Sequence, residues 1–158
     1  MTDTQRNAYA QAVERHSDCV YRLAMVYLRN PQDAQDCCQD VFVKLMERGR
    51  GFENEEHRRA WLLAVTKNAC RDRLRREVCR RGDALEAEAP PDPQGDDEEL
   101  LALVLTLSAN DREVLYLHYY EGYAVREICA LLRLRESAIK QRLLRARNRL
   151  RELLGESA

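Results

Sequence analysis

The most informative part of the chain reads Val125-Arg-Glu-Ile-Cys-Ala-Leu-Leu-Arg-Leu-Arg-Glu-Ser-Ala-Ile-Lys-Gln-Arg-Leu-Leu-Arg-Ala-Arg147. Its apolar spacing predicts a short helix over about 125–132, a tight turn at 133–135 and a longer helix from Glu136 to about Leu154. Two helices joined by a three-residue turn, of which the second is basic, form a helix-turn-helix motif. Such a motif places its second helix in the major groove of DNA.

The longer helix is strongly basic on its open sides. Residues 133–151 include eight Lys and Arg and one acid, a net charge of +7. A charge run of this kind is usually a solvated face, but within a helix-turn-helix it favours DNA binding. Apolar residues at intervals of three and four define the side expected to be buried. They are Ile139, Leu143, Ala146, Leu150 and Leu153.

The exposed face of the first turns of this helix carries side chains that can read bases. They are Ser137, Lys140, Gln141 and Leu144. Glutamine can form two hydrogen bonds to adenine and lysine can reach guanine acceptors, while nearby arginines neutralise phosphates. This face is therefore the candidate DNA-reading surface.

Charge divides the 158 residues into three blocks. Residues 1–82 hold 16 basic and 12 acidic side chains, residues 83–99 hold eight acidic and no basic ones, and residues 100–158 hold ten basic and seven acidic ones. The acidic block contains three of the four prolines and too little apolar surface to fold by itself. We therefore expect two small domains, at 1–82 and 100–158, joined by a flexible acidic linker at 83–99.

The composition predicts an all-α fold. Charged residues make up 34% of the chain and aromatic residues only 6%, which suits helices better than sheets. Because the sequence has no apolar run of about 18 residues and no apolar stretch near Met1, we expect a cytoplasmic protein without membrane insertion or a signal peptide.

The first domain is expected to contain three helices. Its first apolar pattern stops at Asn30-Pro31, where the proline restricts the residue before it, and a third helix begins near Glu55 and ends in a basic segment. The helix between them has an apolar stripe made of Ala34, Cys37, Cys38, Val41, Phe42, Leu45 and Met46. Its opposite, polar face carries Asp36, Gln39, Asp40 and Lys44.

The six cysteines are expected to be reduced and mostly structural. They include no Cys-x-x-Cys pair, and free cysteine packs as a small apolar residue. His16 and Cys19 could form half of a metal site, but no second pair stands out. No activated nucleophile or glycine-rich phosphate loop is found, so neither catalysis nor a cofactor is expected.

Two aromatic residues of the first domain receive different interpretations. Trp61 shares an apolar stripe with Leu62 and Val65 and is expected in the core. Phe52 lies in a glycine-flanked loop, where an exposed ring could stack on an unpaired base.

Two sets of motifs follow each other along the chain. The first comprises Tyr21-Arg-Leu-Ala24, Asp33-Ala-Gln-Asp-Cys-Cys-Gln-Asp-Val-Phe42, Ala60-Trp-Leu62, Lys67-Asn68 and Asp72-Arg-Leu-Arg-Arg76. The second comprises Leu107-Ser108, Arg112-Glu-Val114, Glu121-Gly122, Glu127-Ile128, Ile139-Lys-Gln-Arg142 and Arg145-Ala-Arg147. These sets resemble regions 2 and 4 of bacterial RNA polymerase sigma factors of the extracytoplasmic-function (ECF) group, with a linker in place of region 3.

The resemblance implies an initiation factor, not an enzyme, that binds core RNA polymerase and promoter DNA without a cofactor. In this family the polar face of the second helix docks on the β′ clamp helices, which implies polymerase binding by Asp36, Gln39 and Asp40. The third helix and the loop before it recognise and open the minus-ten element, which implies DNA contacts by Phe52, Lys67, Asn68, Asp72, Arg75 and Arg76.

Region 4 of the family engages the β flap and reads the minus-thirty-five element. The matching residues here are Ser137, Lys140, Gln141, Arg142 and Arg145. The resemblance also implies that the acidic linker lies in positively charged polymerase channels. An anti-sigma factor, possibly membrane-anchored, is the remaining implied partner.

The chain departs from the family at several positions. Arg135 stands where a small residue or proline commonly starts the recognition helix, and Ala138 and Gln141 replace its usual Thr and Ser, so the promoter sequence is not expected to follow the family norm. Arg133 stands where glycine is common in the turn, and Ala124 replaces a capping serine, a loss worth about 1 kcal/mol unless another group compensates. Two alternatives compete with the sigma-factor interpretation. A stand-alone helix-turn-helix regulator would be a dimer on a palindromic site, and a cysteine-based sensor would bind zinc or react with oxidants.

Overall fold

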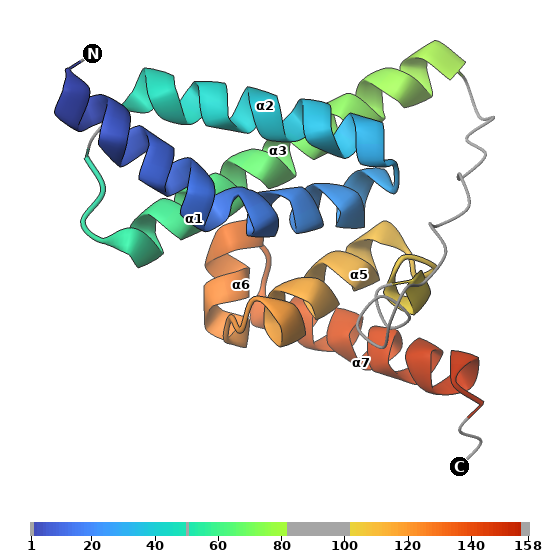
Figure 1. Cartoon of the computed structure of the whole chain (residues 1–158). Helices are drawn as coiled ribbons and strands as arrows, with labels where there is room; N and C mark the ends of the chain where they lie inside the picture. The colour runs from blue at the N-terminus through green and yellow to red at the C-terminus, as the bar shows by residue number, and fades with distance from the viewer. Residues whose placement is uncertain (1, 50, 82–101, 156–158) are drawn as a thin grey trace. The chain divides into compact units, whose positions relative to one another are not determined.

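The computed structural model describes residues 2–49, 51–81 and 102–155, and all regular elements within these ranges are helical (Figure 1). The chain divides into two compact units, Met1–Glu86 and Ala87–Ala158. The predicted all-α fold with two helical domains is therefore confirmed. The linker predicted at 83–99 lies outside the described residues.

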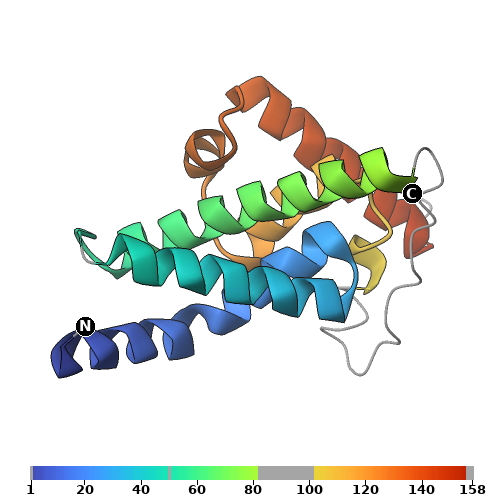
Figure 2. The same cartoon turned by 90° about the horizontal axis from the view of Figure 1, so that it is seen from above.

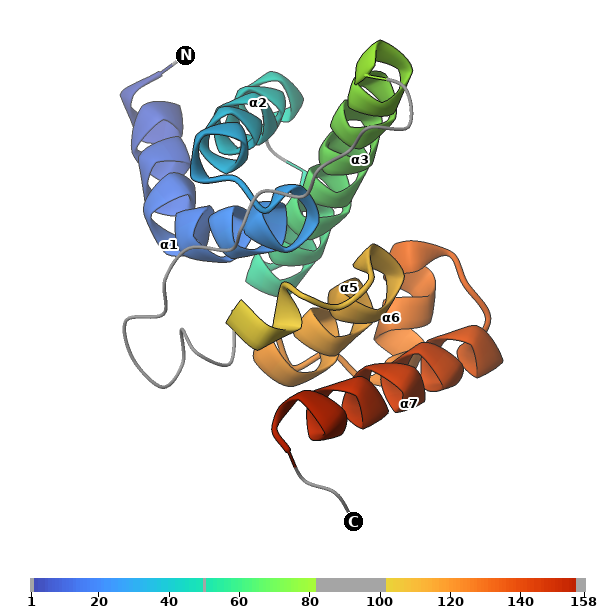
Figure 3. The ribbon, with the colours of Figure 1, turned by 90° about the vertical axis from the view of Figure 1, so that its right-hand side faces the viewer.

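The first unit is a three-helix bundle of α1 (Asp3–Leu28), α2 (Pro31–Arg48) and α3 (Glu55–Arg81). Each helix packs against the other two (Figures 2 and 3). The largest fully buried side chains of this bundle come from all three helices: Val20, Leu23, Val26, Val41, Leu62 and Leu63. The apolar periodicity of the sequence thus forms a single core between the helices.

Polar side chains fix where the helices of this unit begin. Thr2 and Gln5 form a reciprocal capping box at the start of α1. The predicted stop before Pro31 is confirmed, because Arg29 takes a left-handed conformation with φ 58° and Asn30 caps α2 through Asp33 N–H at 3.0 Å.

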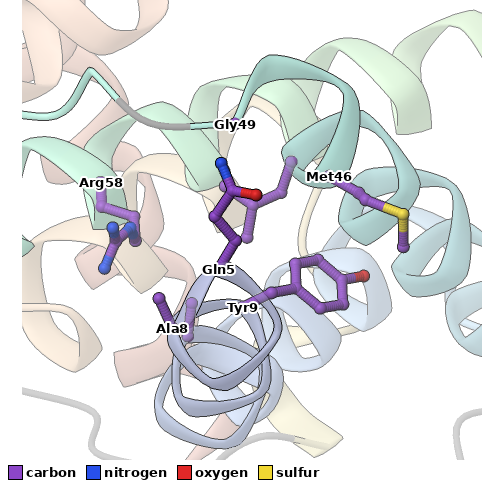
Figure 4. A pocket seen from close by; sticks show the side chains of 8 residues that line it. Gln5, Ala8, Tyr9, Met46, Gly49 and Arg58 are labelled. Carbon is purple, nitrogen blue, oxygen red and sulfur yellow. The ribbon is translucent and has the colours of Figure 1, made fainter. Parts of the chain in front are cut away.

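The buried stripe of α2 is narrower than predicted. Cys37 is buried, whereas Cys38 is only partly buried and Met46 is 45% exposed. Met46 borders a shallow groove of about 220 Å³ between α1, the end of α2 and the start of α3 (Figure 4). The prediction that Met46 belongs to the core is therefore wrong, because Met46 lines this open groove instead of packing between the helices. Its other lining residues are Gln5, Ala8, Tyr9, Ala12, Leu45, Gly49 and Arg58.

The second unit contains a helical turn at 102–104, α5 (Ala109–Leu115), the π-helical segment η1 (Tyr116–Tyr120), α6 (Val125–Leu132) and α7 (Glu136–Leu153). The predicted helix from Ala109 ends where expected, at Gly122 with φ 76°, but its last turn is π-helical. α7 packs on α5 and α6 through Ile139, Leu143 and Ala146. Leu153 is 38% exposed, so the buried stripe of α7 stops before the last helical turn and the prediction for Leu153 is wrong.

Glu55 links the first and third helices of the bundle. Its Oε2 lies 2.9 Å from Nε2 of the buried His16, and Arg15 and Arg58 lie within ion-pair distance. The hydrogen bond from His16 is the main cause that lowers the pKa of Glu55 below its ordinary value of 4.5, with the two arginines adding to it.

We expect Glu55→Gln to lower the free energy of unfolding at neutral pH by about 0.5–1 kcal/mol, a small effect because the carboxylate is nearly half exposed and screened by solvent. A carboxyl whose pKa is lower in the folded state stabilises the fold above its unfolded pKa and loses this effect as pH falls through the folded value. The difference from wild type should therefore shrink as the pH falls below 4.5 in urea titrations. Glu56→Gln is the control, because Glu56 is more exposed and pairs only within α3. A constant difference across pH would contradict this assignment.

Candidate functional site

The outward face of α2 is polar and only partly engaged with the rest of the bundle. Gln39 and Asp40 are exposed. Asp36 is partly buried, and its Oδ2 lies 3.5 Å from Arg73 of α3, which also contacts Asp33 at 3.3 Å. The three residues predicted to bind polymerase therefore share one face, but Asp36 also joins α2 to α3.

Val43 extends this face by one helical turn beyond Gln39 and Asp40. It is 49% exposed. A single exposed valine is common on protein surfaces, so the sequence pattern alone did not single it out. Its place on the same helical face as the exposed polar residues makes it a further candidate for partner contact.

Five of the six residues predicted to contact the minus-ten element lie on α3, and they differ in exposure. Asn68, Asp72, Arg75 and Arg76 are exposed and recur at helical intervals on one side, and Asp72 pairs with Arg75 at 2.8 Å. Lys67 is only 8% exposed. Because DNA contact needs an accessible ammonium group, we remove Lys67 from the candidate surface.

Phe52 is less exposed than the loop sequence suggested. Its ring packs edge-on against Trp61 and His57, with centroids 5.5 and 5.3 Å away, and the Arg48 guanidinium lies 4.3 Å from its centroid. Both Phe52 and Trp61 are partly buried. These neighbours leave only part of the Phe52 ring open, and base stacking by this ring stays a prediction.

The helix-turn-helix has the expected geometry despite its unusual residues. Arg133 adopts a left-handed conformation with φ 57°, which lets the chain turn where glycine is common. Arg135 begins α7 without a side-chain cap. Before α6, the Ala124 N–H donates to Glu127 Oε1 at 3.0 Å, so the Glu127 half of a capping box is present, while the bond that a serine hydroxyl would accept is not.

The outward face of α7 carries four of the five residues predicted to read the minus-thirty-five element. Ser137, Lys140, Gln141 and Arg145 are exposed. Lys140 pairs with Glu136 at 2.8 Å, which raises the pKa of Lys140 and lowers that of Glu136, and Arg145 pairs with Asp111 at 3.2 Å. Leu144, 56% exposed, continues this face.

Arg142, the fifth residue of that set, points into the unit. Its Nη1 lies 3.3 Å from Oε1 of Glu113, which has no exposed surface, and only 18% of the Arg142 side chain is exposed. A buried carboxylate is stable only with charged or hydrogen-bonding partners. We therefore assign Arg142 to positioning α7, and we remove it from the candidate DNA surface.

The described ranges offer no metal centre. No group of three or more His, Cys, Asp or Glu residues within them is placed to hold a metal ion. His16 and Cys19, considered as half a site, instead bond to Glu55 and to the His16 carbonyl oxygen, respectively. None of the helices built from the described residues is long and apolar enough to cross a membrane.

Comparison with known proteins identifies the two units. The model of Sigma-70 region 2 matches residues 12–78, and that of Sigma-70 region 4 matches residues 97–150. The ECF RNA polymerase sigma factor SigM of Mycobacterium tuberculosis is 30% identical over 95% of this chain and 79% of its own. The RNA polymerase sigma factor CarQ of Myxococcus xanthus is 30% identical over 98% and 93% of the two chains.

Solved structures agree with this fold. The sigma factor RpoE of Bartonella quintana, in complex with the anti-sigma factor NepR, superposes with a TM-score of 0.78 at 24% identity over 96% of this chain and 99% of that one. CnrH, in complex with the cytosolic domain of CnrY, superposes with a TM-score of 0.68 at 27% identity, over 97% of this chain and 91% of that one.

Regions 2 and 4 together define a sigma factor. The chain belongs to the ECF RNA polymerase sigma factors, which are transcription initiation factors, not enzymes, that bind core RNA polymerase and direct it to promoters. The stand-alone regulator is not favoured, because it leaves the whole of region 2 without a role.

The assignment of Arg142 to positioning can be tested by stability. We expect Arg142→Ala to destabilise the second unit by about 3 kcal/mol, because a buried carboxylate loses a charged partner. Lys140→Ala, which removes a solvated charge from the same helix, should change stability by less than about 0.5 kcal/mol. Urea unfolding followed by circular dichroism measures both.

Paired replacement separates charge from packing. Glu113→Leu combined with Arg142→Leu should recover most of the loss, since apolar residues of similar volume often replace a buried ion pair without cost. Equal stability of Arg142→Ala and Lys140→Ala would show that Arg142 has no positioning role.

Proposed function

We propose that the two units divide promoter recognition, with residues 1–82 binding polymerase and the minus-ten element, residues 83–99 acting as the linker, and residues 100–158 reading the minus-thirty-five element. The observation that carries this proposal is that α2, α3 and α7 each bury one side and present exposed polar or charged residues on another. A helix held in this way offers its outward side chains to a partner in a fixed order.

The outward face of α2 is the proposed polymerase contact. Asp40 and Gln39 are exposed, Asp36 lies beside them, and Val43 adds apolar area. Carboxylates steer association with a positively charged surface and fix its register, while apolar contact contributes burial. This combination suits the β′ clamp helices, the partner implied by membership of the family.

The exposed side of α3 is the proposed minus-ten surface. It consists of Asn68, Asp72, Arg75 and Arg76. Arginine binds phosphates, and amide and carboxylate groups can bond the edges of unpaired bases. Phe52, with its ring partly covered, is proposed to contribute only its open edge to base stacking.

The exposed side of α7 is the proposed minus-thirty-five surface. Lys140 and Gln141 lie one turn into the helix, where side chains reach base edges in the major groove. Leu144 is suited to contact a thymine methyl group, and Ser137 and Arg145 are suited to bond bases or phosphates. Region 4 is also proposed to engage the β flap.

The chain is proposed to act by binding alone. Capture of flipped bases can drive promoter opening without hydrolysis, so no cofactor or covalent step by this chain is required. We place its action in the cytoplasm, where bacterial RNA polymerase works. The RpoE–NepR and CnrH–CnrY complexes support a further partner, an anti-sigma factor that covers these surfaces and is possibly membrane-anchored.

The polymerase contact is tested by reversing one charge. We expect Asp40→Arg to lower the affinity for core polymerase and the yield of chain-dependent transcript by about tenfold or more, because a carboxylate in the interface becomes a repelling cation. Glu14→Arg makes the same charge change at an exposed position of α1 and should behave as wild type. Equal binding by both variants would contradict the proposed face.

The promoter contact is tested by a change in sequence preference. We expect Gln141→Ala to relax selection at one base pair of the minus-thirty-five element by about fivefold to tenfold, since a bidentate base contact contributes about 1–3 kcal/mol. Arg149→Ala, on the exposed side of the same helix, should weaken binding evenly across sequences. The readout is a selection from randomised duplexes, and an unchanged preference in Gln141→Ala would contradict base reading by this residue.

A further inference from the structure

Two cysteines from different helices of the first unit lie in contact. Cys37 of α2 and Cys70 of α3 are 33 positions apart in the chain, and their Sγ atoms are 3.4 Å apart. Their side chains are 2% and 0% exposed. The sequence contains no Cys-x-x-Cys pair, so only the packing of α2 on α3 brings these thiols together.

One member of the pair faces a surface groove. Cys37 lines an opening of about 260 Å³ between α2 and α3, and Cys70 is not among its lining residues. Lys44, Arg73 and Arg76 place positive charge around this groove, and Asp40, Glu47 and Asp72 place an equal number of negative charges there. A small oxidant can therefore approach Cys37 from this side, with Cys70 directly behind it.

The surroundings favour a thiolate at Cys37. A hydrogen bond with the Cys70 thiol lowers the pKa of Cys37, and Arg73 and Lys44 act in the same direction, although burial and Asp40 oppose them. The pKa of Cys70 is raised by the same hydrogen bond and by burial. Burial raises the pKa of the adjacent Cys38 to about 12, so this neighbour remains a thiol. Reactive cysteines in proteins often lie beside a lysine or arginine, as Cys37 does beside Arg73 and Lys44, and often have a second cysteine nearby.

We propose that Cys37 and Cys70 form a reversible disulfide when the protein meets a hydroperoxide. The Cys37 thiolate attacks the peroxide, so that an S–O bond forms, the O–O bond breaks, and the leaving oxygen takes a proton to become an alcohol or water. The Cys70 thiol then attacks the sulfenic sulfur, an S–S bond forms, and the S–O bond breaks to release water with the thiol proton. The two thiols lose two electrons and the peroxide gains them.

The disulfide would covalently join α2 to α3. These helices carry the proposed polymerase face and the proposed minus-ten surface, so an oxidant signal would act on the seam between them. The chemistry itself goes beyond the proposed function and does not depend on it, because disulfide formation can be followed in the isolated protein.

The test uses the full-length, fully reduced chain exposed to hydrogen peroxide. Remaining thiols are blocked with N-ethylmaleimide under denaturing conditions, and the protein is digested with trypsin without reductant and analysed by mass spectrometry. We expect a disulfide between the peptides covering residues 30–44 and 68–71, which disappears after treatment with dithiothreitol. The oxidised chain should also unfold several degrees higher, since the cross-link restricts the unfolded state.

Adjacent cysteines provide a matched pair of variants. Cys38→Ser should still form the linked peptides, because Cys37 is retained, whereas Cys37→Ser should not form them. The wild-type protein alone can overturn the proposal. It would do so if, after peroxide treatment, Cys70 carries the maleimide label and Cys37 is either labelled or oxidised without forming a disulfide. Persistence of the link in Cys37→Ser would overturn the assignment of Cys37 as the attacking thiol.

Discussion

The ion pair between Glu113 and Arg142 constrains the whole surface that we propose reads the minus-thirty-five element. Glu113 has no exposed surface, and the cation 3.3 Å from it comes from α7. Together with the buried residues Ile139 and Leu143, this contact fixes the rotation of α7 about its axis. Lys140 and Gln141 therefore point outward because the opposite side of α7 buries Ile139, Leu143 and the Arg142 ion pair.

In the first unit, buried contacts on one side of α2 and α3 likewise determine which side chains of these helices face outward. α2 buries its apolar stripe against α1 and α3, and Arg73 of α3 holds Asp33 and Asp36 at the seam. Acids close to this seam support the bundle, while Asp40, farther out, is exposed. The contact between Cys37 and Cys70 lies in this seam as well, between the proposed polymerase face and the proposed minus-ten surface.

Local sequence predicted the elements well because their signals are local. The stop at Pro31, the turn at Arg133 and the start of α7 at Glu136 depend on residues within a few positions of each boundary. The π-helical turn at Tyr116–Tyr120 carried no comparable signal. The inward direction of Arg142 depends on Glu113, 29 positions away, so motif matching could not separate it from exposed neighbours. The cover over Phe52 comes from residues within nine positions, but only their packing in the folded chain shows it, and the burial of Lys67 likewise carried no sequence signal.

The most direct test of the division of labour is in vitro transcription by core RNA polymerase from a library of randomised promoters, with and without this chain, followed by sequencing of transcripts and templates. If the two units read separate elements, chain-dependent transcripts will arise from templates that share two short motifs at a constant spacing upstream of the start. Duplex DNA binding without core polymerase, together with no chain-dependent transcript, would contradict this function.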